Sequence, residues 1–137
     1  MEEVNRYMVQ KDRERIESYI ERKRINATMS ESGLWYSISK KGSEPLLALS
    51  DTILIEYNCS LLDGTRCYSS TESGPKRIVI GKSNIESGLD LGLRLLGRGG
   101  EAIFIIPSFL AHGLLGDGSR IPAMSVLVYE VKVIEDK

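Results

Sequence analysis

The side chains in this sequence that are best suited to covalent or metal chemistry are two cysteines and one histidine. Three such residues without paired spacing do not make up a four-ligand zinc site. His112 lies in a glycine-rich stretch, and no G-x-S-x-G element that would present a nucleophilic serine occurs in the sequence. We therefore expect no metal, no other cofactor and no covalent catalysis.

The two cysteines flank an Asp63-Gly64 turn signal almost symmetrically. If the hairpin has a three-residue bulged loop, Cys59 and Cys67 both lie on the Tyr57 side and could face one another across the ladder. This pattern is compatible with a disulfide between the two residues and with two buried free thiols. An oxidising compartment would favour the disulfide.

Length, composition and charge narrow the class of protein. With 137 residues, of which 42% are hydrophobic and 27% charged, the chain fits one folded, soluble domain. The net charge is -1 and the signs of charge alternate over residues 11–15, so nucleic acid is not expected as a partner. The apolar runs fall far short of the roughly 20 residues that cross a bilayer. No basic start precedes an apolar stretch, so we expect any export signal to be absent from this sequence.

The first expected element is an amphipathic helix over residues 10–25, with Ile16, Tyr19 and Ile20 as a narrow apolar stripe. Acidic residues near its start, Asp12 among them, complement the helix dipole and are assigned to a solvated face. The stripe is too short for an independent coiled coil, so we expect docking on the same domain or a spacer, and a monomer rather than a dimer.

Beyond the helix, residues 26–33 collect Asn, Thr, Ser and Gly and are predicted to be a linker. This divides the chain into a helical extension with linker at 1–32 and a domain at 33–137. In the domain the hydrophobic period changes to two, which is typical of strands. Strands are expected over residues 34–39, 52–60, 65–69, 77–80, 101–106 and 125–134, and one short helix over 84–96.

Two further features complete the expected fold. The apolar run at residues 103–106 predicts burial on both faces of the sheet, and residues 107–124 are expected to form a long loop, a kind that is usually functional or disordered. Five or six strands with one short helix predict an antiparallel α+β domain.

Ordered motifs over about residues 33–137 resemble the FKBP-type peptidyl-prolyl isomerases. The motifs are Ile55-x-Tyr57, Leu62-Asp63-Gly64 with Ser69-Ser70, Ile80-Gly81-Lys82, Gly88, Ile106-Pro107 with Ala111-x-Gly113, Ile121-Pro122, and Leu127-Val128-Tyr129-Glu130-Val131. The resemblance implies a twisted antiparallel sheet curved around one short helix. The extension and the segment Gly33-Leu34-Trp35-Tyr36 further resemble a gliding-motility-associated lipoprotein subgroup of Bacteroidetes-type bacteria.

The activity that the resemblance implies is rotation about the bond before proline. This rotation has a barrier of about 18–20 kcal/mol because it breaks amide resonance. The twisted amide is less dipolar than the planar one, so an apolar pocket that holds the proline ring favours the transition state. A thousandfold acceleration requires only about 4 kcal/mol, and no covalent step.

The resemblance also assigns pocket positions. Tyr57 and Tyr129 match aromatic walls, and Ile85 matches an aliphatic wall. The backbone N–H of Glu86 matches a donor to a substrate carbonyl, while its side chain is expected to be solvated at the rim. Ile121 matches a residue on the long loop that faces the opening.

Other positions depart from the family pattern. They are Cys67-Tyr68 where the family usually has Phe-Asp, Lys76 where it often has Phe, Leu89 where it usually has Trp, and His112 where it usually has Tyr. These changes remove aromatic area and a carboxylate, although Phe109 and Tyr68 could restore aromatic surface.

Two functions therefore remain open. One is a peptidyl-prolyl isomerase or foldase acting on proline-containing segments of exported proteins, outside the cytoplasm. The other is a non-catalytic chaperone or assembly module that keeps the same scaffold. If the export assignment fails, the location is cytoplasmic.

Overall fold

The computed structural model describes residues 2–113 and 115–134. The elements in chain order are α1 (Glu2–Lys23), β1 (Thr28–Met29), β2 (Trp35–Lys40), β3 (Thr52–Leu61), β4 (Arg66–Ser69), α2 (Ser70–Ser73), β5 (Lys76–Val79), α3 (Ser87–Leu93), β6 (Glu101–Ile106), the 3-10 helix η1 (Ser108–Leu110) and β7 (Leu127–Ile134).

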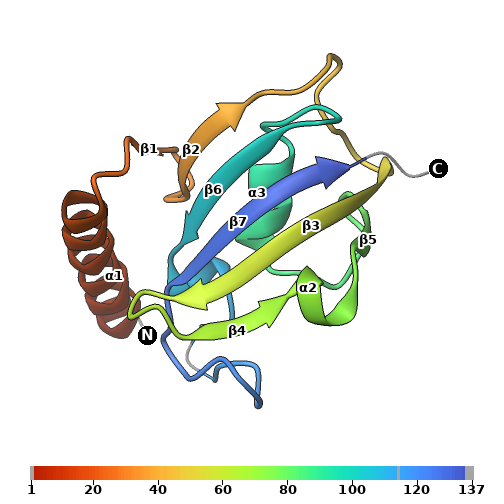
Figure 1. Cartoon of the computed structure of the whole chain (residues 1–137). Helices are drawn as coiled ribbons and strands as arrows, with labels where there is room; N and C mark the ends of the chain where they lie inside the picture. The colour runs from red at the N-terminus through yellow and green to blue at the C-terminus, as the bar shows by residue number, and fades with distance from the viewer. Residues whose placement is uncertain (1, 114, 135–137) are drawn as a thin grey trace.

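The strands form one antiparallel sheet in the order β1-β2-β6-β7-β3-β4, with β5 paired to β3. Figure 1 shows this twisted sheet with α3 behind it and α1 at the end where β6 stops and β7 begins. The sheet has seven strands rather than five or six, because residues 28–29 of the expected linker pair with Trp35 and Tyr36. The α+β class and the antiparallel sheet around a short helix are confirmed.

The main core lies between the sheet and α3, and alternate residues of the central strands supply it. Phe104 and Ile106 of β6 face this core, together with Leu127, Tyr129 and Val131 of β7. A second, smaller cluster lies on the opposite face, where Ile103, Ile105, Val126 and Val128 pack against Ile16, Tyr19 and Ile20 of α1. The run at residues 103–106 is therefore buried on both faces, as its composition predicts.

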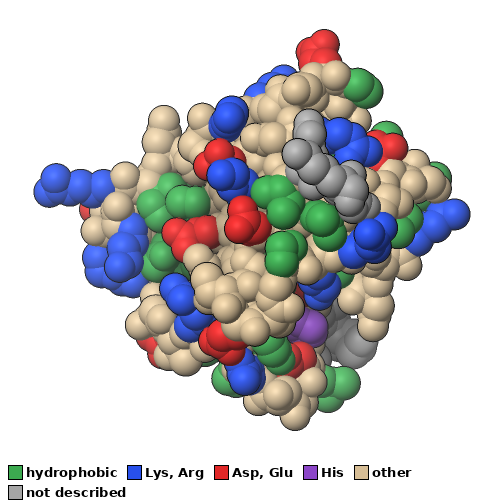
Figure 2. Space-filling view, turned by 45° about the vertical axis from the view of Figure 1, so that its right-hand side comes forward, with side chains coloured by type: hydrophobic (Ala, Val, Ile, Leu, Met, Phe, Trp, Pro, Cys, Tyr) green, Lys and Arg blue, Asp and Glu red, His purple; other side chains and the backbone are tan. Residues whose placement is uncertain are grey.

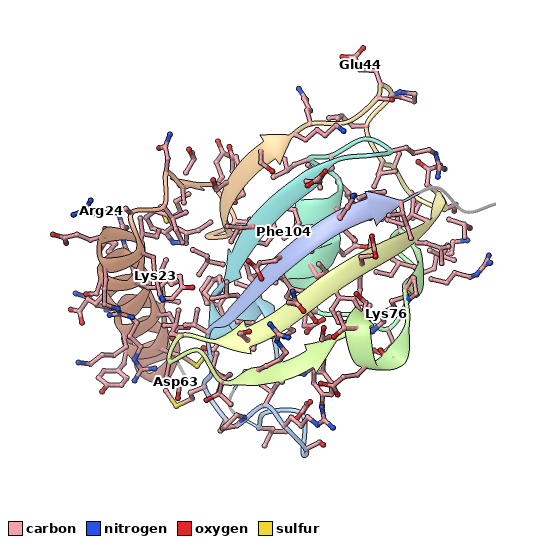
Figure 3. The ribbon with its side chains drawn as sticks, viewed as in Figure 1. Lys23, Arg24, Glu44, Asp63, Lys76 and Phe104 are labelled. Carbon is pink, nitrogen blue, oxygen red and sulfur yellow. The ribbon has the colours of Figure 1, made fainter. Side chains whose placement is uncertain are left out.

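The helix α3 packs close to the sheet because two of its residues have no side chain. A Cβ atom at Gly88 would lie 2.4 Å from Cγ2 of Ile106, and one at Gly92 would lie 2.9 Å from the ring of Phe104. Figure 3 shows Phe104 in front of this helix. The helix is shorter than the expected 84–96, because Glu86 is extended and Leu95 and Leu96 bond back by three residues instead of four.

The helix α1 begins at Glu2, earlier than the expected residue 10. Met8 and Asp12 continue the line of Ile16 at four-residue spacing, and all three side chains are buried. Asp12 is 1% exposed, so its assignment to a solvated face is wrong. The aspartate hides the length of the apolar stripe because a charged residue interrupts it in the sequence. The helix docks on its own domain.

Two short helices lie where none was expected. Ser69 caps α2 by accepting a hydrogen bond from the N–H of Thr71, and η1 forms the first turn of the long loop at residues 107–124. Among the residues that the structure describes, no helix combines the length and apolar character needed to cross a membrane.

The two cysteines are free thiols and are not opposite one another. Cys59 pairs with Tyr68, and Cys67 falls at the register shift between β3 and β4. Both side chains are buried in the main core. Burial raises the pKa of Cys59 to about 12.

We expect the buried thiol of Cys59 to make the fold sensitive to alkali. The unfolded thiol ionises near pH 8.5 but the folded one does so near 12, so stability is complete below the first value and falls between the two. The loss approaches about 1.4 kcal/mol per pH unit. Urea unfolding of wild type and Cys59→Ala at several pH values from 8 upward measures it. The variant should be less stable at neutral pH but lose this part of the slope, and equal slopes would contradict the assignment.

Candidate functional site

A cavity of about 610 Å³ opens beside the two tyrosines of the central strands. Its lining comes from β3, β4, β5, the turn before α3, the first residue of α3, the long loop and β7. It consists of Tyr57, Tyr68, Lys76, Asn84, Ile85, Glu86, Ser87, Ala111, His112, Asp117 and Tyr129. Cavities of this volume accept small organic groups such as a proline ring with its neighbouring peptide units.

Strand register places the two main aromatic walls together. Tyr57 pairs with Val131 and Cys59 pairs with Tyr129, so Tyr57 and Tyr129 are diagonal neighbours on one face of the sheet. Their ring centroids are 6.1 Å apart, with planes inclined by 36°. The aliphatic side chain of Ile85 and the ring of Tyr68 complete the apolar part of the lining.

The side chain of Glu86 turns into the molecule, contrary to the expected solvated rim position. The residue is 9% exposed, and its carboxylate Oε2 accepts a 2.7 Å hydrogen bond from the Tyr129 hydroxyl. His112 Nε2 lies 3.5 Å from the same oxygen. The sequence carried one signal for this arrangement, because a buried tyrosine hydroxyl requires a hydrogen-bond partner.

Burial, together with the charge of Glu86, raises the pKa of Tyr129 far above its usual value, so the phenol stays protonated as a donor. His112 is partly exposed on the cavity wall. Figure 2 shows His112, the single histidine of the sequence, in purple at the molecular surface. Within the described residues, no group of three or more His, Cys, Asp or Glu side chains is placed to hold a metal ion.

Asp117 supplies a carboxylate to the cavity from the long loop, a residue that the sequence did not single out. It accepts a 2.5 Å hydrogen bond from the Tyr68 hydroxyl and further bonds from the N–H groups of Ser119 and Ile121. This hydrogen bond to Asp117 raises the pKa of Tyr68. Desolvation raises the pKa of Asp117, but the three hydrogen bonds outweigh it and lower the pKa overall.

Arg120 holds the same part of the loop against the sheet. Its Nη1 donates a 2.8 Å hydrogen bond to the carbonyl of Cys67, and its guanidinium carbon lies 5.4 Å from the ring centroid of Tyr68. A weaker ion pair at 3.6 Å joins it to Glu72, where both side chains are more than half exposed. The loop that carries Asp117 is therefore tied to β4.

Four residues that the sequence assigned to the pocket do not line this cavity. Cys67, Leu89 and Ile121 are 2% exposed or less and belong to the main core. Phe109 is 38% exposed, and the tip of its ring packs against Gly33, where a Cβ atom would lie 2.9 Å from Cζ. Phe109 therefore cannot restore aromatic surface to the cavity. Six of the assigned residues do line it, namely Tyr57, Tyr68, Ile85, Glu86, His112 and Tyr129.

Lys76, Asn84, Ser87, Ala111 and Asp117 complete the lining without having been proposed as pocket residues. Lys76 was noted only as a replacement for a frequent Phe, and Figure 3 shows it at the start of β5. The segment that carries Asp117 has no hydrophobic period, so no sequence signal indicated which of its side chains turn inward.

Comparison with known proteins gives a consistent result. The family model for FKBP-type peptidyl-prolyl cis-trans isomerase matches residues 46–134. The chain is 41% identical over 88 residues to peptidyl-prolyl cis-trans isomerase FKBP10 of Mus musculus. It is 36% identical over 104 residues to the probable FKBP-type peptidyl-prolyl cis-trans isomerase FkpA of Neisseria meningitidis. These matches span 63% and 76% of this chain, but only 15% and 38% of the two relatives.

Solved structures agree with the sequence matches. The crystal structure of AtFKBP13 superposes with a TM-score of 0.75 at 27% identity, over 82% of this chain and 99% of that one. The crystal structure of FkpA from Escherichia coli gives a TM-score of 0.76 at 25% identity, over 96% of this chain and 63% of that one. Coverage of 96% includes most of α1 in the second match.

The pair of Tyr129 and Glu86 is expected to stabilise the fold. Tyr129→Phe should lower the free energy of unfolding by about 1–3 kcal/mol, because it leaves a buried carboxylate without its main donor. A double-mutant cycle with Glu86→Leu, followed by urea unfolding, measures the coupling. Tyr57→Phe is the matched control on the same wall. Strictly additive effects of the two changes would show that the hydrogen bond contributes nothing.

Proposed function

Because this chain belongs to the family of FKBP-type peptidyl-prolyl cis-trans isomerases, we propose that it catalyses rotation about X-Pro bonds in the cavity between Tyr57 and Tyr129. The observation that carries the proposal is that this cavity is open. Leu89, Ile121 and Cys67 pack into the core beneath it, and the long loop forms one of its walls without filling it.

The cavity can act on a prolyl bond without a nucleophile. The rings of Tyr57 and Tyr129 and the side chain of Ile85 would contact the proline ring and exclude water from the amide. Removal of water favours the twisted, less dipolar amide over the planar one. The walls thereby bind the transition state more tightly than the ground state.

The backbone at Glu86 offers a donor for the substrate. Within residues 2–113 and 115–134, the N–H of Glu86 donates to no other group, whereas the neighbouring N–H of Ile85 bonds to the carbonyl of Ser83. Glu86 precedes the first turn of α3, where N–H groups lack partners within the helix. This N–H is available to a substrate carbonyl at the edge of the cavity.

A second candidate is a binding module that holds proline-containing segments without catalysis. The observation that favours it is the polar side of the cavity, where Glu86, Asp117, His112 and Lys76 form part of the lining. Water attracted by these groups would reduce the preference for the twisted amide. The two candidates share a ligand and differ only in rate acceleration.

An isomerase assay separates these two candidates. We expect the protein to accelerate cis-trans exchange of an Xaa-Pro peptide, and Tyr57→Ala to lower kcat/KM by about 10- to 100-fold because one aromatic wall is lost. Leu49→Ala, an exposed position outside the cavity lining, is the control and should keep wild-type activity. Exchange spectroscopy by NMR measures the rate without a coupled protease. Peptide binding without acceleration at micromolar protein would leave only the binding module.

We propose further that the protein acts outside the cytoplasm on exported proteins, as a monomer. The similarity to FkpA, which extends over most of α1 in the superposition, supports a bacterial protein in which a helical extension precedes the FKBP-like domain.

Docking of the apolar side of α1 on its own sheet favours a monomer, because that side is not free to pair with a second chain. Fractionation of the source cells tests the location, and recovery in the cytosol alone would exclude it. Membership of the gliding-motility-associated lipoprotein subgroup stays a prediction, and recovery of the protein in the membrane fraction would support it.

A further inference from the structure

The helix α1 is joined to the long loop by a buried carboxyl group. Asp12, in the middle of α1, is 1% exposed, and Ser108, the first residue of η1, is fully buried. Oδ2 of Asp12 accepts a 2.8 Å hydrogen bond from the N–H of Ser108 and a 2.5 Å bond from its hydroxyl. These two bonds link positions that are 96 residues apart in the sequence.

Stability alone is a poor explanation for an aspartate at this position. Its other oxygen, Oδ1, is buried and has no hydrogen-bond partner among the described residues. Arg15 Nη1 lies 4.0 Å from this oxygen, and the Arg15 side chain is half exposed. Burial of a half-satisfied carboxyl group is unfavourable. An apolar residue would continue the stripe of Met8 and Ile16 without that penalty.

Ser108 stands at the start of the segment that forms one wall of the cavity. Its carbonyl accepts hydrogen bonds from the N–H groups of Ala111 and Gly113, the two neighbours of His112. Ala111 and His112 both line the cavity. The position of Ser108 therefore determines where the backbone presents His112 to Glu86.

The same turn also contacts a second segment of the cavity lining, at the start of α3. The carbonyl of Leu110, the last residue of η1, accepts a 3.2 Å hydrogen bond from the hydroxyl of Ser87, which follows Glu86. Figure 1 shows α1 beside the end of β6, from which this turn continues. One short turn thus connects α1 to the histidine on one side and to the residue after Glu86 on the other.

We propose that Asp12 is a positioning residue for the cavity, which acts through Ser108 to hold the turn at residues 108–113 in its binding geometry. The helix α1, which lies outside the segment matched by the family model, is then part of the machinery that shapes the pocket. The kinetic part of this proposal rests on the proposed function, whereas the structural part does not.

The first experiment is amide hydrogen exchange on the full chain. Asp12→Ala should speed exchange at Ala111 and Gly113 by about tenfold or more, while amides in β3 and β7 keep their wild-type protection. Asp12→Asn retains an acceptor oxygen and should restore part of the protection. Glu14→Ala, an exposed acidic position on the same helix, is the matched control.

If Asp12→Ala does not fold, Ser108→Ala removes the hydroxyl bond alone and should give a smaller change at the same two amides.

Kinetics provides the second readout. Asp12→Ala should raise KM several-fold with little change in kcat, because the peptide must order the loosened turn before it binds. Unchanged exchange at Ala111 and Gly113, or equal acceleration throughout the sheet, would overturn the proposal. If neither the wild-type protein nor any variant shows isomerase activity, the proposed catalysis is wrong. Amide exchange at Ala111 and Gly113 then still decides whether Asp12 positions the loop.

Discussion

The arrangement of the site depends on the pairing of β3 with β7. This register sets which residues share a face, since a slip by one residue would turn every side chain of a strand to the other side of the sheet. With Cys59 opposite Tyr129, both tyrosine rings point toward α3 and flank the cavity. The close packing that Gly88 and Gly92 allow brings the turn at Glu86 within reach of the Tyr129 hydroxyl.

Two polar groups of the cavity, the hydroxyls of Tyr129 and Tyr68, are paired with carboxylates, so the site is not an entirely apolar pocket. The hydroxyl of Tyr129 has Glu86 as its acceptor, and the hydroxyl of Tyr68 has Asp117. The buried hydroxyl of Tyr129 would be costly without its carboxylate, and buried Glu86 would be costly without its donor. The two tyrosines and the two carboxylates therefore form two hydrogen-bonded pairs.

The helix α1 has two kinds of contact with the domain, and they differ in chemistry. Its apolar side covers the outer face of the sheet, where the contact depends on burial and tolerates small shifts. Asp12 makes a directional contact with Ser108, which specifies one position of the helix relative to the long loop. Figure 3 shows a further neighbour, Asp63 at the turn between β3 and β4, which lines a hollow with residues of α1.

The α+β class and the main strands could be predicted from the sequence, because a hydrophobic period of two and turn residues are local properties of the chain. The resemblance implied that Tyr57 and Tyr129 line one pocket, and the register of β3 with β7 places them on one face. Ordered motifs also predicted the family. Long-range packing, by contrast, turns Glu86 inward, brings Asp117 into the cavity lining, buries Asp12, and places Phe109 and Ile121 elsewhere. These positions lie in irregular segments or depend on how α1 docks, so contacts between distant residues fix them and no local periodicity records those contacts.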